Sequence, residues 1–225
     1  MNVGLLIDIE GIDGTGKGTQ SHKLVERLQH NGVSAQLISF PRYEATLFGH
    51  AVGDFLNGRF GSLEQVSPFL AALLFAGDRF ESRNFLERAR ATYDVVVLDR
   101  YVVSNVAHQA AKGRGAERQE LMNWILQVEH SVFGMPHADL ILLLDLPVAQ
   151  AQTLVASKIP RNYTLRQADI QEADPAYLES VREVYLELAR DPHWRIVHCA
   201  EGSQTRAVDD IAEELWQIVQ NCRSA

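Results

Sequence analysis

The chain has 225 residues, of which 46% are hydrophobic, and a formal net charge of −8 at pH 7. This length and composition suffice for one domain with a full hydrophobic core over residues 1–225. The acidic balance argues against DNA or RNA as a partner, because nucleic-acid-binding proteins usually carry a basic surplus. A small phosphate ligand needs only a few local cations, so this class of ligand stays open.

Cellular location is the next property that the composition bears on. The two cysteines, Cys199 and Cys222, form no disulfide framework and suit a reduced cytosol. The N-terminal region has no basic segment, and its apolar run is broken by Asp8 and Glu10. No apolar stretch approaches the roughly 20 residues that a membrane helix needs. We therefore expect a soluble, cytoplasmic protein without a membrane partner.

The first predicted element is a strand over Leu5–Ile9, followed by the glycine-rich segment Glu10–Thr19 and a helical pattern from Gly16 to His30. Glycines between a strand and a helix allow successive backbone N–H groups to point at one anion, with a lysine as a mobile cation. A chance glycine turn is the alternative. The residues predicted to hold nucleotide phosphates are Gly11, Gly14, Thr15, Gly16, Lys17, Gly18 and Thr19.

The loop departs from the strict phosphate-loop pattern at one position. That pattern places a hydroxyl residue directly after the lysine, whereas here Gly18 follows Lys17 and Thr19 comes one place later. Direct magnesium ligation by the loop is therefore weakened. The metal would be held through water or through Thr19.

Four more strand-like runs follow, separated by helical segments: Ala35–Phe40, Val95–Asp99, Leu140–Leu146 and Arg195–Cys199. These runs lack polar alternation, which is typical of strands buried on both faces. Asp174 and Pro175 predict a helix start, and the apolar positions from Val208 to Val219 recur at helical spacing. The pattern predicts an α/β protein of the P-loop type, a five-stranded parallel sheet between two helical layers.

Ligands of such sheets bind outside the carboxyl ends of the strands. The second predicted strand runs into Phe40-Pro41-Arg42-Tyr43 and the third into Asp99-Arg100. We therefore expect Lys17, Arg42, Asp99 and Arg100 to reach one crevice. Two arginines there could fork onto a phosphate, although each could instead form a surface ion pair. The carboxylate of Asp99 stands where P-loop proteins hold magnesium, and a helix N-cap is its alternative role.

Two helix faces resemble a base and sugar pocket. Phe75 and Arg79 are four residues apart, so an aromatic plane and a guanidinium share one face. A core phenylalanine beside a solvated arginine is the alternative. Tyr101, Ser104, Asn105 and His108 form a polar stripe, for which a solvated helix face is the default interpretation.

Taken in order, these motifs resemble those of the thymidylate kinase (dTMP kinase) family, from Leu5 to about Leu188. The motifs are E-G-x-D-G-x-G-K-x-T-Q, F-P-R-Y, L-F-A-x-D-R, D-R-Y-x-x-S-N and Pro136-His-Ala-Asp139. Each is weak alone, but the ordered set separates this family from other nucleoside monophosphate kinases. The resemblance implies a homodimer that transfers the γ-phosphoryl group of ATP to dTMP, with Mg²⁺ as cofactor, in dTTP biosynthesis.

The resemblance also implies a role for each matched residue. Asp13 would hold the substrate 3′-hydroxyl and the magnesium network, and Arg42 and Arg100 would bind the dTMP phosphate. Phe75 would stack on thymine and Arg79 would donate to its O4 atom. Asn105 would face the base edge, and the loop with Lys17 would carry the ATP phosphates. The substrate site would further include Phe40, Pro41, Tyr43, Ser104 and His108.

The family uses a mobile basic lid after the fourth strand, which here corresponds to about 157–172. Some members carry an arginine in the phosphate loop, and others supply it from the lid. Gly14 places this chain in the second group, so the candidate lid cations are Lys158, Arg161 and Arg166. A solvated loop with scattered charges is the alternative, because the family's D-x-Y-E pattern aligns only loosely with Asp169-Ile-Gln-Glu172.

His108 stands where the family commonly has tyrosine or phenylalanine beside the sugar C2′. A smaller ring that can form hydrogen bonds would loosen discrimination against ribonucleotides, and a histidine without a ligand role is the alternative. A kinase of another deoxynucleotide or of a deoxynucleoside therefore stays open.

A P-loop switch or regulatory nucleotide-binding module is a third alternative, from a different functional class. Against it, the chain lacks the N-K-x-D element expected for guanine recognition.

Overall fold

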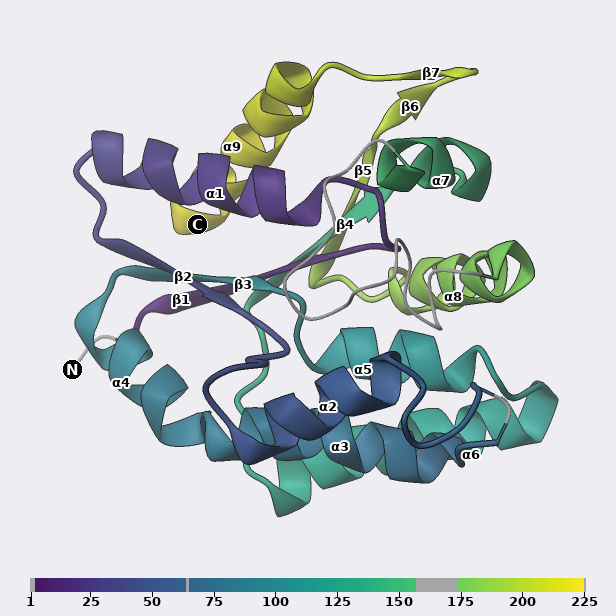
Figure 1. Ribbon diagram of the computed structural model, residues 1–225. Helices are drawn as coiled ribbons and strands as arrows, with labels where there is room; N and C mark the ends of the chain where they lie inside the picture. Colours follow the sequence, from purple (N-terminus) through teal and green to yellow (C-terminus); the bar gives the residue numbers. More distant parts are fainter. Residues whose placement is uncertain (1–2, 64, 157–173, 225) are drawn as a thin grey trace.

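A computed structural model describes residues 3–63, 65–156 and 174–224. Its centre is a five-stranded parallel sheet in the order β2-β3-β1-β4-β5 (Figure 1). The strands are β1 (Leu5–Glu10), β2 (Ala35–Ser39), β3 (Val95–Asp99), β4 (Leu140–Asp145) and β5 (Trp194–His198). This arrangement confirms the predicted fold class.

The strand boundaries differ from the predicted ones by one residue. β2 ends at Ser39 and β4 at Asp145, each one residue earlier than predicted, and β5 begins at Trp194, one residue earlier. A short antiparallel pair, β6 (Ala200–Glu201) and β7 (Gln204–Thr205), was not predicted. Two-residue strands have too little sequence for any alternation to be visible.

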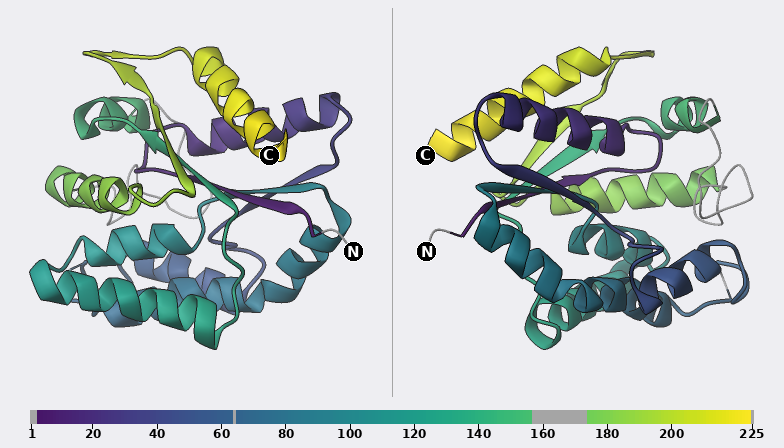
Figure 2. Two further views of the ribbon diagram at one scale, coloured as in Figure 1. Left: turned by 180° about the vertical axis from the view of Figure 1, so that it is seen from behind. Right: turned by 60° about the vertical axis from the view of Figure 1, so that its left-hand side comes forward.

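Helices cover both faces of the sheet (Figures 1 and 2). One face carries α1 (Lys17–His30) and α9 (Val208–Ser224), and the other carries α4 (Arg83–Thr92), α5 (Val102–Ala110) and α8 (Pro175–Leu188). Against α5 pack α3 (Pro68–Glu81) and α6 (Gly115–Leu126). The remaining helices are α2 (Leu47–Leu56) against α3, a π-helical turn η1 (Gln127–Val132) after α6, and α7 (Val148–Ala156) beside α8.

The two predicted C-terminal helices form, with one difference in their buried face. Asp174 caps α8 as predicted, and its Oδ1 accepts hydrogen bonds from the backbone N–H groups of Ala176 (2.9 Å) and Tyr177 (3.3 Å). In α9 only Ile211, Leu215 and Val219 are buried, whereas Val208 is exposed. The buried face of α9 is narrower than predicted, because the helix packs mainly against α1 and β5.

Strand β1 carries two carboxylates into the interior. Leu6, Asp8 and Glu10 point to the face covered by α4, α5 and α8, while Ile7 and Ile9 pack beneath the opposite layer. Both Asp8 and Glu10 are completely buried. Within the described residues, no helix is long and apolar enough to cross a bilayer.

Candidate phosphate-binding and catalytic site

The loop after β1 folds as the glycine pattern predicts. Gly14 and Gly16 have positive φ angles of 95° and 91°, which residues with a side chain rarely adopt. A Cβ atom at Gly14 would lie 2.3 Å from the carbonyl oxygen of Ala151, so this position also needs the absence of a side chain. Lys17 begins α1, and its Nζ donates to the carbonyl oxygen of Ile12 at 2.9 Å. The helix amino terminus therefore faces the inside of the loop, where an anion binds favourably.

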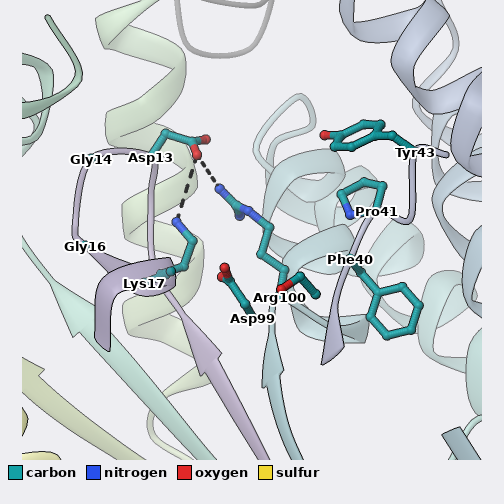
Figure 3. Close-up of a pocket in the computed structure, with 11 residues that line it drawn as sticks. Asp13, Gly14, Gly16, Lys17, Phe40, Pro41, Tyr43, Asp99 and Arg100 are labelled. Atoms are coloured by element: carbon teal, nitrogen blue, oxygen red, sulfur yellow. Dashed lines mark hydrogen bonds and ion pairs between the residues drawn. The ribbon is translucent and has the colours of Figure 1, made fainter. Parts of the chain in front are cut away.

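A cleft of about 370 Å³ lies against this loop, at the carboxyl ends of β1, β2 and β3 (Figure 3). It is lined by Asp13, Gly14, Gly16, Lys17, Gly18, Ser39, Phe40, Pro41, Tyr43, Asp99 and Arg100. The structure thus brings together residues that are up to 87 positions apart in the chain. This is the position that the strand order predicts for a ligand.

Arg100 is the centre of the cleft (Figure 3). Its Nη2 donates to Oδ1 of Asp13 at 2.6 Å, and its Nη1 donates to the hydroxyl of Ser104 at 2.8 Å. Lys17 Nζ lies 3.9 Å from the same Asp13 oxygen. Among the described residues other than glycine, only Arg100 has a positive φ, of 69°. This left-handed backbone conformation costs energy for a residue with a side chain, and it persists only where the surrounding structure holds it in place.

Glu10 is the group that fixes this turn, and the sequence analysis did not identify it. Its Oε1 accepts a hydrogen bond from the backbone N–H of Tyr101 at 2.8 Å, and its Oε2 accepts one from the hydroxyl of Tyr185 at 2.7 Å. Burial raises the pKa of Glu10, whereas Arg100 and the two hydrogen bonds act in the opposite direction. The sequence signal that could have identified Glu10 was an acidic residue at the end of an otherwise apolar strand.

The charge of Lys17 depends on pH in a range that matters for anion binding. Burial, followed by the nearby Arg100 guanidinium, lowers the pKa of Lys17 to about 8, and Asp13 and Asp99 only partly oppose this. The ammonium form is therefore partly lost just above neutral pH when no anion is bound. A phosphate in the loop would favour the charged form.

The residues at the cleft can accommodate magnesium. A Cβ atom on Gly18 would lie 3.3 Å from Oδ2 of Asp99, so the glycine leaves open space beside this carboxylate. Within the described part of the chain, no cluster of three or more His, Cys, Asp or Glu side chains could hold a metal by itself. Magnesium commonly binds through one or two carboxylates together with water and phosphate oxygens, so Asp99 fits. Thr19 is exposed and does not line the cleft.

Arg42 does not line the cleft that its neighbours form. Its guanidinium lies over the ring of Phe85, 4.4 Å from the centroid, and donates to the hydroxyl of Ser82 at 3.1 Å. Its backbone N–H donates to Oδ2 of Asp78 at 2.9 Å. The expectation that Arg42 and Arg100 reach one crevice is therefore not met in this structure, because Ser82, between α3 and α4, and Phe85 of α4 hold the side chain of Arg42 away.

Arg79 is buried rather than solvated, and its partner is a residue that the sequence analysis missed. Arg79 forms a two-pronged ion pair with Glu129 of η1, with Nε 2.9 Å from Oε2, and both side chains are almost inaccessible to solvent. Asn105 donates to the same carboxylate at 3.0 Å, while its own Oδ1 is buried without a hydrogen-bond partner among the described residues. Phe75 packs edge-on against Phe55.

The polar stripe on α5 is buried, so the solvated interpretation is wrong. Ser104, Asn105 and His108 are at most 7% exposed, because α5 is enclosed between α3, α6 and α8. The ring of His108 lies 3.4 Å from Nη1 of Arg100 and 3.3 Å from the hydroxyl of Tyr177. Burial and then Arg100 lower the pKa of His108 to about 3, so the ring is neutral at physiological pH.

The predicted lid, with Lys158, Arg161, Arg166, Asp169 and Glu172, lies outside the described residues.

Comparisons with known proteins agree on one family. A sequence model described as thymidylate kinase matches residues 9–211. The chain is 33% identical over 185 residues to a thymidylate kinase of Mycobacterium tuberculosis, covering 82% of this chain and 86% of that protein. It is 31% identical to a probable thymidylate kinase of Thermococcus onnurineus, covering 96% and 98% of the two chains.

Solved structures give the same answer. A thymidylate kinase from Candida albicans, described as having broad substrate specificity, superimposes with a TM-score of 0.75 and 26% identity. The match covers 98% of this chain and 93% of that one. The likeness therefore extends over the sheet, both helical layers and the cleft.

The buried Arg79–Glu129 pair yields a prediction about stability. Glu129→Ala should lower the free energy of unfolding by about 3–5 kcal/mol, because an arginine remains buried without its counter-charge. Urea unfolding measures this. The double variant Arg79→Met/Glu129→Leu should lose less than Glu129→Ala alone, because it leaves no unpaired charge. Glu87→Ala, which removes the exposed partner of Arg83, is the control and should cost less than about 1 kcal/mol. Equal losses for Glu129→Ala and Glu87→Ala would contradict the assignment.

Proposed function

We propose that this chain, which belongs to the thymidylate kinase family, transfers the γ-phosphoryl group of ATP to dTMP at the cleft of Figure 3, producing dTDP and ADP for dTTP biosynthesis. The observation that carries the proposal is the juxtaposition of the phosphate loop with the Asp13–Arg100 pair. The phosphate loop suits a nucleotide phosphate, and Arg100 suits a second anion beside it.

The reaction follows from the positions of these charges. ATP phosphates bind to the loop amides and Lys17, and the dTMP phosphate binds to Arg100. A phosphate monoester needs no strong general base as a nucleophile, so the site mainly aligns two anions and cancels their charge. Asp13 restrains both cations before substrate arrives. It also accepts a hydrogen bond from the 3′-hydroxyl of dTMP.

Magnesium would be held by Asp99, directly or through water, with Asp13 in its outer network, and would neutralise charge on the transferred phosphoryl group. The open space beside Gly18 supports this placement. Thr19 is a weaker candidate, because its side chain is on the exposed side of α1.

The base pocket is built around Glu129. This carboxylate fixes the guanidinium of Arg79, which donates to thymine O4, and the amide of Asn105. The unpartnered Oδ1 of Asn105 is then available to accept the N3–H of the base. Phe75 provides the stacking surface. A base that lacks this donor and acceptor pattern would leave buried polar atoms unpaired.

A second acceptor class is favoured by one observation, the buried neutral ring of His108 beside Arg100. A small ring that can exchange hydrogen bonds permits other deoxynucleotides or a 2′-hydroxyl. The Candida albicans relative, with its broad substrate specificity, makes this alternative worth testing.

The quaternary and domain organisation belong to the same proposal. Apolar side chains stay exposed on α2 and α3, among them Leu47, Phe48, Leu70 and Phe80. A second copy of this chain would cover them, giving a cytoplasmic homodimer of one-domain subunits that span residues 1–225.

Light scattering should give a particle mass of about twice the chain mass of 25.2 kDa. Phe48→Glu should lower this particle mass, because a charge would be buried in the subunit interface. A monomeric wild type would contradict the dimer.

Segment 157–172 would form the lid, and Arg161 or Arg166 would supply its catalytic cation, with Lys158 as the third candidate. The absence of an arginine at Gly14 supports this placement.

The proposed activity is tested by ADP release with Mg-ATP and dTMP, dUMP, UMP, dCMP or thymidine as acceptor. We expect dTMP to give the highest kcat/KM. The cytosine of dCMP cannot complete the Arg79 and Asn105 pairs, whereas the uracil of dUMP completes both but lacks the apolar contact of the 5-methyl group. Higher kcat/KM with UMP would indicate that His108 admits the 2′-hydroxyl. A preference for thymidine would overturn the monophosphate assignment, and no turnover with any acceptor would support the regulatory alternative.

Removing Arg100 should lower kcat about 10³–10⁵-fold, by analogy with arginines that stabilise phosphoryl-transfer transition states. The variant is Arg100→Met, with circular dichroism to show that it is folded. Arg59→Met is the matched control, because Arg59 is an exposed arginine paired only with Asp54 among the described residues. A folded Arg100→Met enzyme with near-normal kcat would contradict the role of Arg100.

The pKa of Lys17 predicts a pH dependence of ATP affinity. Lysine is charged below its pKa, so the free enzyme loses this cation as pH rises through about 8. The Kd for ATP should therefore increase several-fold between pH 7 and pH 9.5. In Lys17→Arg the guanidinium stays charged over this range, so its Kd should stay nearly constant. Parallel pH profiles for the two proteins would show that another group is responsible.

A further inference from the structure

Tyr185 is a buried side chain that extends from α8 toward the active site. It lies near the end of the helix, beside the buried Val181 and Val184, and is 1% exposed. The two valines need only apolar contacts, whereas a buried tyrosine hydroxyl needs a hydrogen-bond partner. The partners of this hydroxyl therefore show what the tyrosine does beyond filling the core.

The hydroxyl of Tyr185 bridges β1 and α5. It donates to Oε2 of Glu10 at 2.7 Å, and it lies 3.1 Å from the hydroxyl oxygen of Ser104. The hydroxyl of Ser104 in turn accepts a hydrogen bond from Nη1 of Arg100 at 2.8 Å. Four side chains that are far apart in the sequence therefore form one continuous chain of hydrogen bonds, which ends at the arginine of the cleft.

The chemistry of these groups fixes the direction of each hydrogen bond. A guanidinium has donors only, so the oxygen of Ser104 accepts from Arg100. Burial and then the neighbouring Glu10 raise the pKa of Tyr185 well above its usual value, so the phenol keeps its proton and donates it to the carboxylate. The proton of Ser104 is then left for the oxygen of Tyr185. Each of the two hydroxyl groups acts once as a donor and once as an acceptor.

This chain of hydrogen bonds constrains the guanidinium of Arg100. Nη2 donates to Oδ1 of Asp13 at 2.6 Å, and Nη1 donates to Ser104. An isolated serine hydroxyl can rotate and present its oxygen in several directions. A serine that must donate to Tyr185 presents its oxygen to Arg100 in only one of them. The contact between Ser104 and Tyr185 therefore limits the orientations that the guanidinium can take.

We propose that Tyr185 is a positioning residue for phosphoryl transfer, which orients the guanidinium of Arg100 through the hydroxyl of Ser104. Tyr185 does not line the cleft, so it acts on the reaction only through other side chains. The role rests on the proposed kinase function. Misplacing a catalytic group by about 1 Å can cost about 100-fold in rate, so one hydroxyl outside the cleft can control turnover.

A purely structural role is the competing account. In that account the hydroxyl only connects α8 to the sheet, and removing it lowers stability but leaves the kcat of the folded enzyme unchanged. The ring of Tyr185 separately packs edge-on against His108, with centroids 6.5 Å apart. Tyr185→Phe keeps this packing and removes only the hydroxyl, so the variant separates the two accounts.

Steady-state kinetics of Tyr185→Phe test the proposal, with Mg-ATP and the acceptor that the wild type uses best. We expect kcat to fall about 10–100-fold, because the cation remains but is less well oriented. The Kd for ATP should stay close to that of the wild type, because Tyr185 does not contact the phosphate loop. Tyr93→Phe is the control. It removes the hydroxyl of a half-buried tyrosine before the amino end of β3, away from the cleft, and should keep the wild-type kcat.

Ser104→Ala and the double variant Ser104→Ala/Tyr185→Phe complete the test. Ser104→Ala should also lower kcat. The double variant should lose about as much as the more impaired single variant, because both substitutions interrupt the same chain of hydrogen bonds. Circular dichroism and urea unfolding show that each protein is folded.

The outcomes separate the positioning role from the proposed function. Wild-type kcat in folded Tyr185→Phe or folded Ser104→Ala would overturn the positioning role alone, and so would losses that multiply in the double variant. Absence of turnover by the wild type with every acceptor would instead overturn the proposed function, and the positioning role with it.

Discussion

The active-site geometry depends on one buried carboxylate, Glu10 at the end of β1. It accepts hydrogen bonds from the backbone of Tyr101 and the hydroxyl of Tyr185, and thereby connects the sheet to α5 and α8. The left-handed backbone at Arg100 costs on the order of 1–3 kcal/mol, and hydrogen bonds to a charged group contribute about 1.5–3 kcal/mol each. These two interactions are therefore strong enough to hold the turn that directs Arg100 at Asp13.

The cleft concentrates positive charge in an acidic protein. The chain as a whole has a net charge of −8, whereas Lys17 and Arg100 lie together at one cleft and are held in place by Asp13. Because these groups are oriented before substrate binds, little reorganisation is needed when charge develops in the transition state. The lowered pKa of Lys17 arises first from burial and then from the nearby Arg100 cation, and a bound phosphate would favour the charged form of the lysine.

The sequence predicted the parallel sheet, the phosphate loop and the family, because each rests on local patterns such as buried strands and glycine spacing. It also placed Lys17, Asp99 and Arg100 at one edge, since parallel strands share their carboxyl ends. It could not predict that Arg42 turns toward Phe85, or that Glu129 neutralises Arg79 from 50 positions away. These outcomes depend on long-range side-chain packing, which carries no periodic signal. Asp8 and Glu10 were visible as acids within an apolar run, but their partners appear only in three dimensions.

The most direct test of this account is the kcat for dTMP phosphorylation in Glu10→Leu and Glu10→Gln, with far-ultraviolet circular dichroism and ATP affinity as controls. Leucine fills a similar volume but cannot accept the Tyr101 hydrogen bond, whereas glutamine can. We expect folded Glu10→Leu to bind ATP within a few-fold of the wild type and to lose at least 100-fold in kcat, with much of the activity retained by Glu10→Gln. A folded Glu10→Leu enzyme with wild-type kcat would contradict the claim that Glu10 positions Arg100.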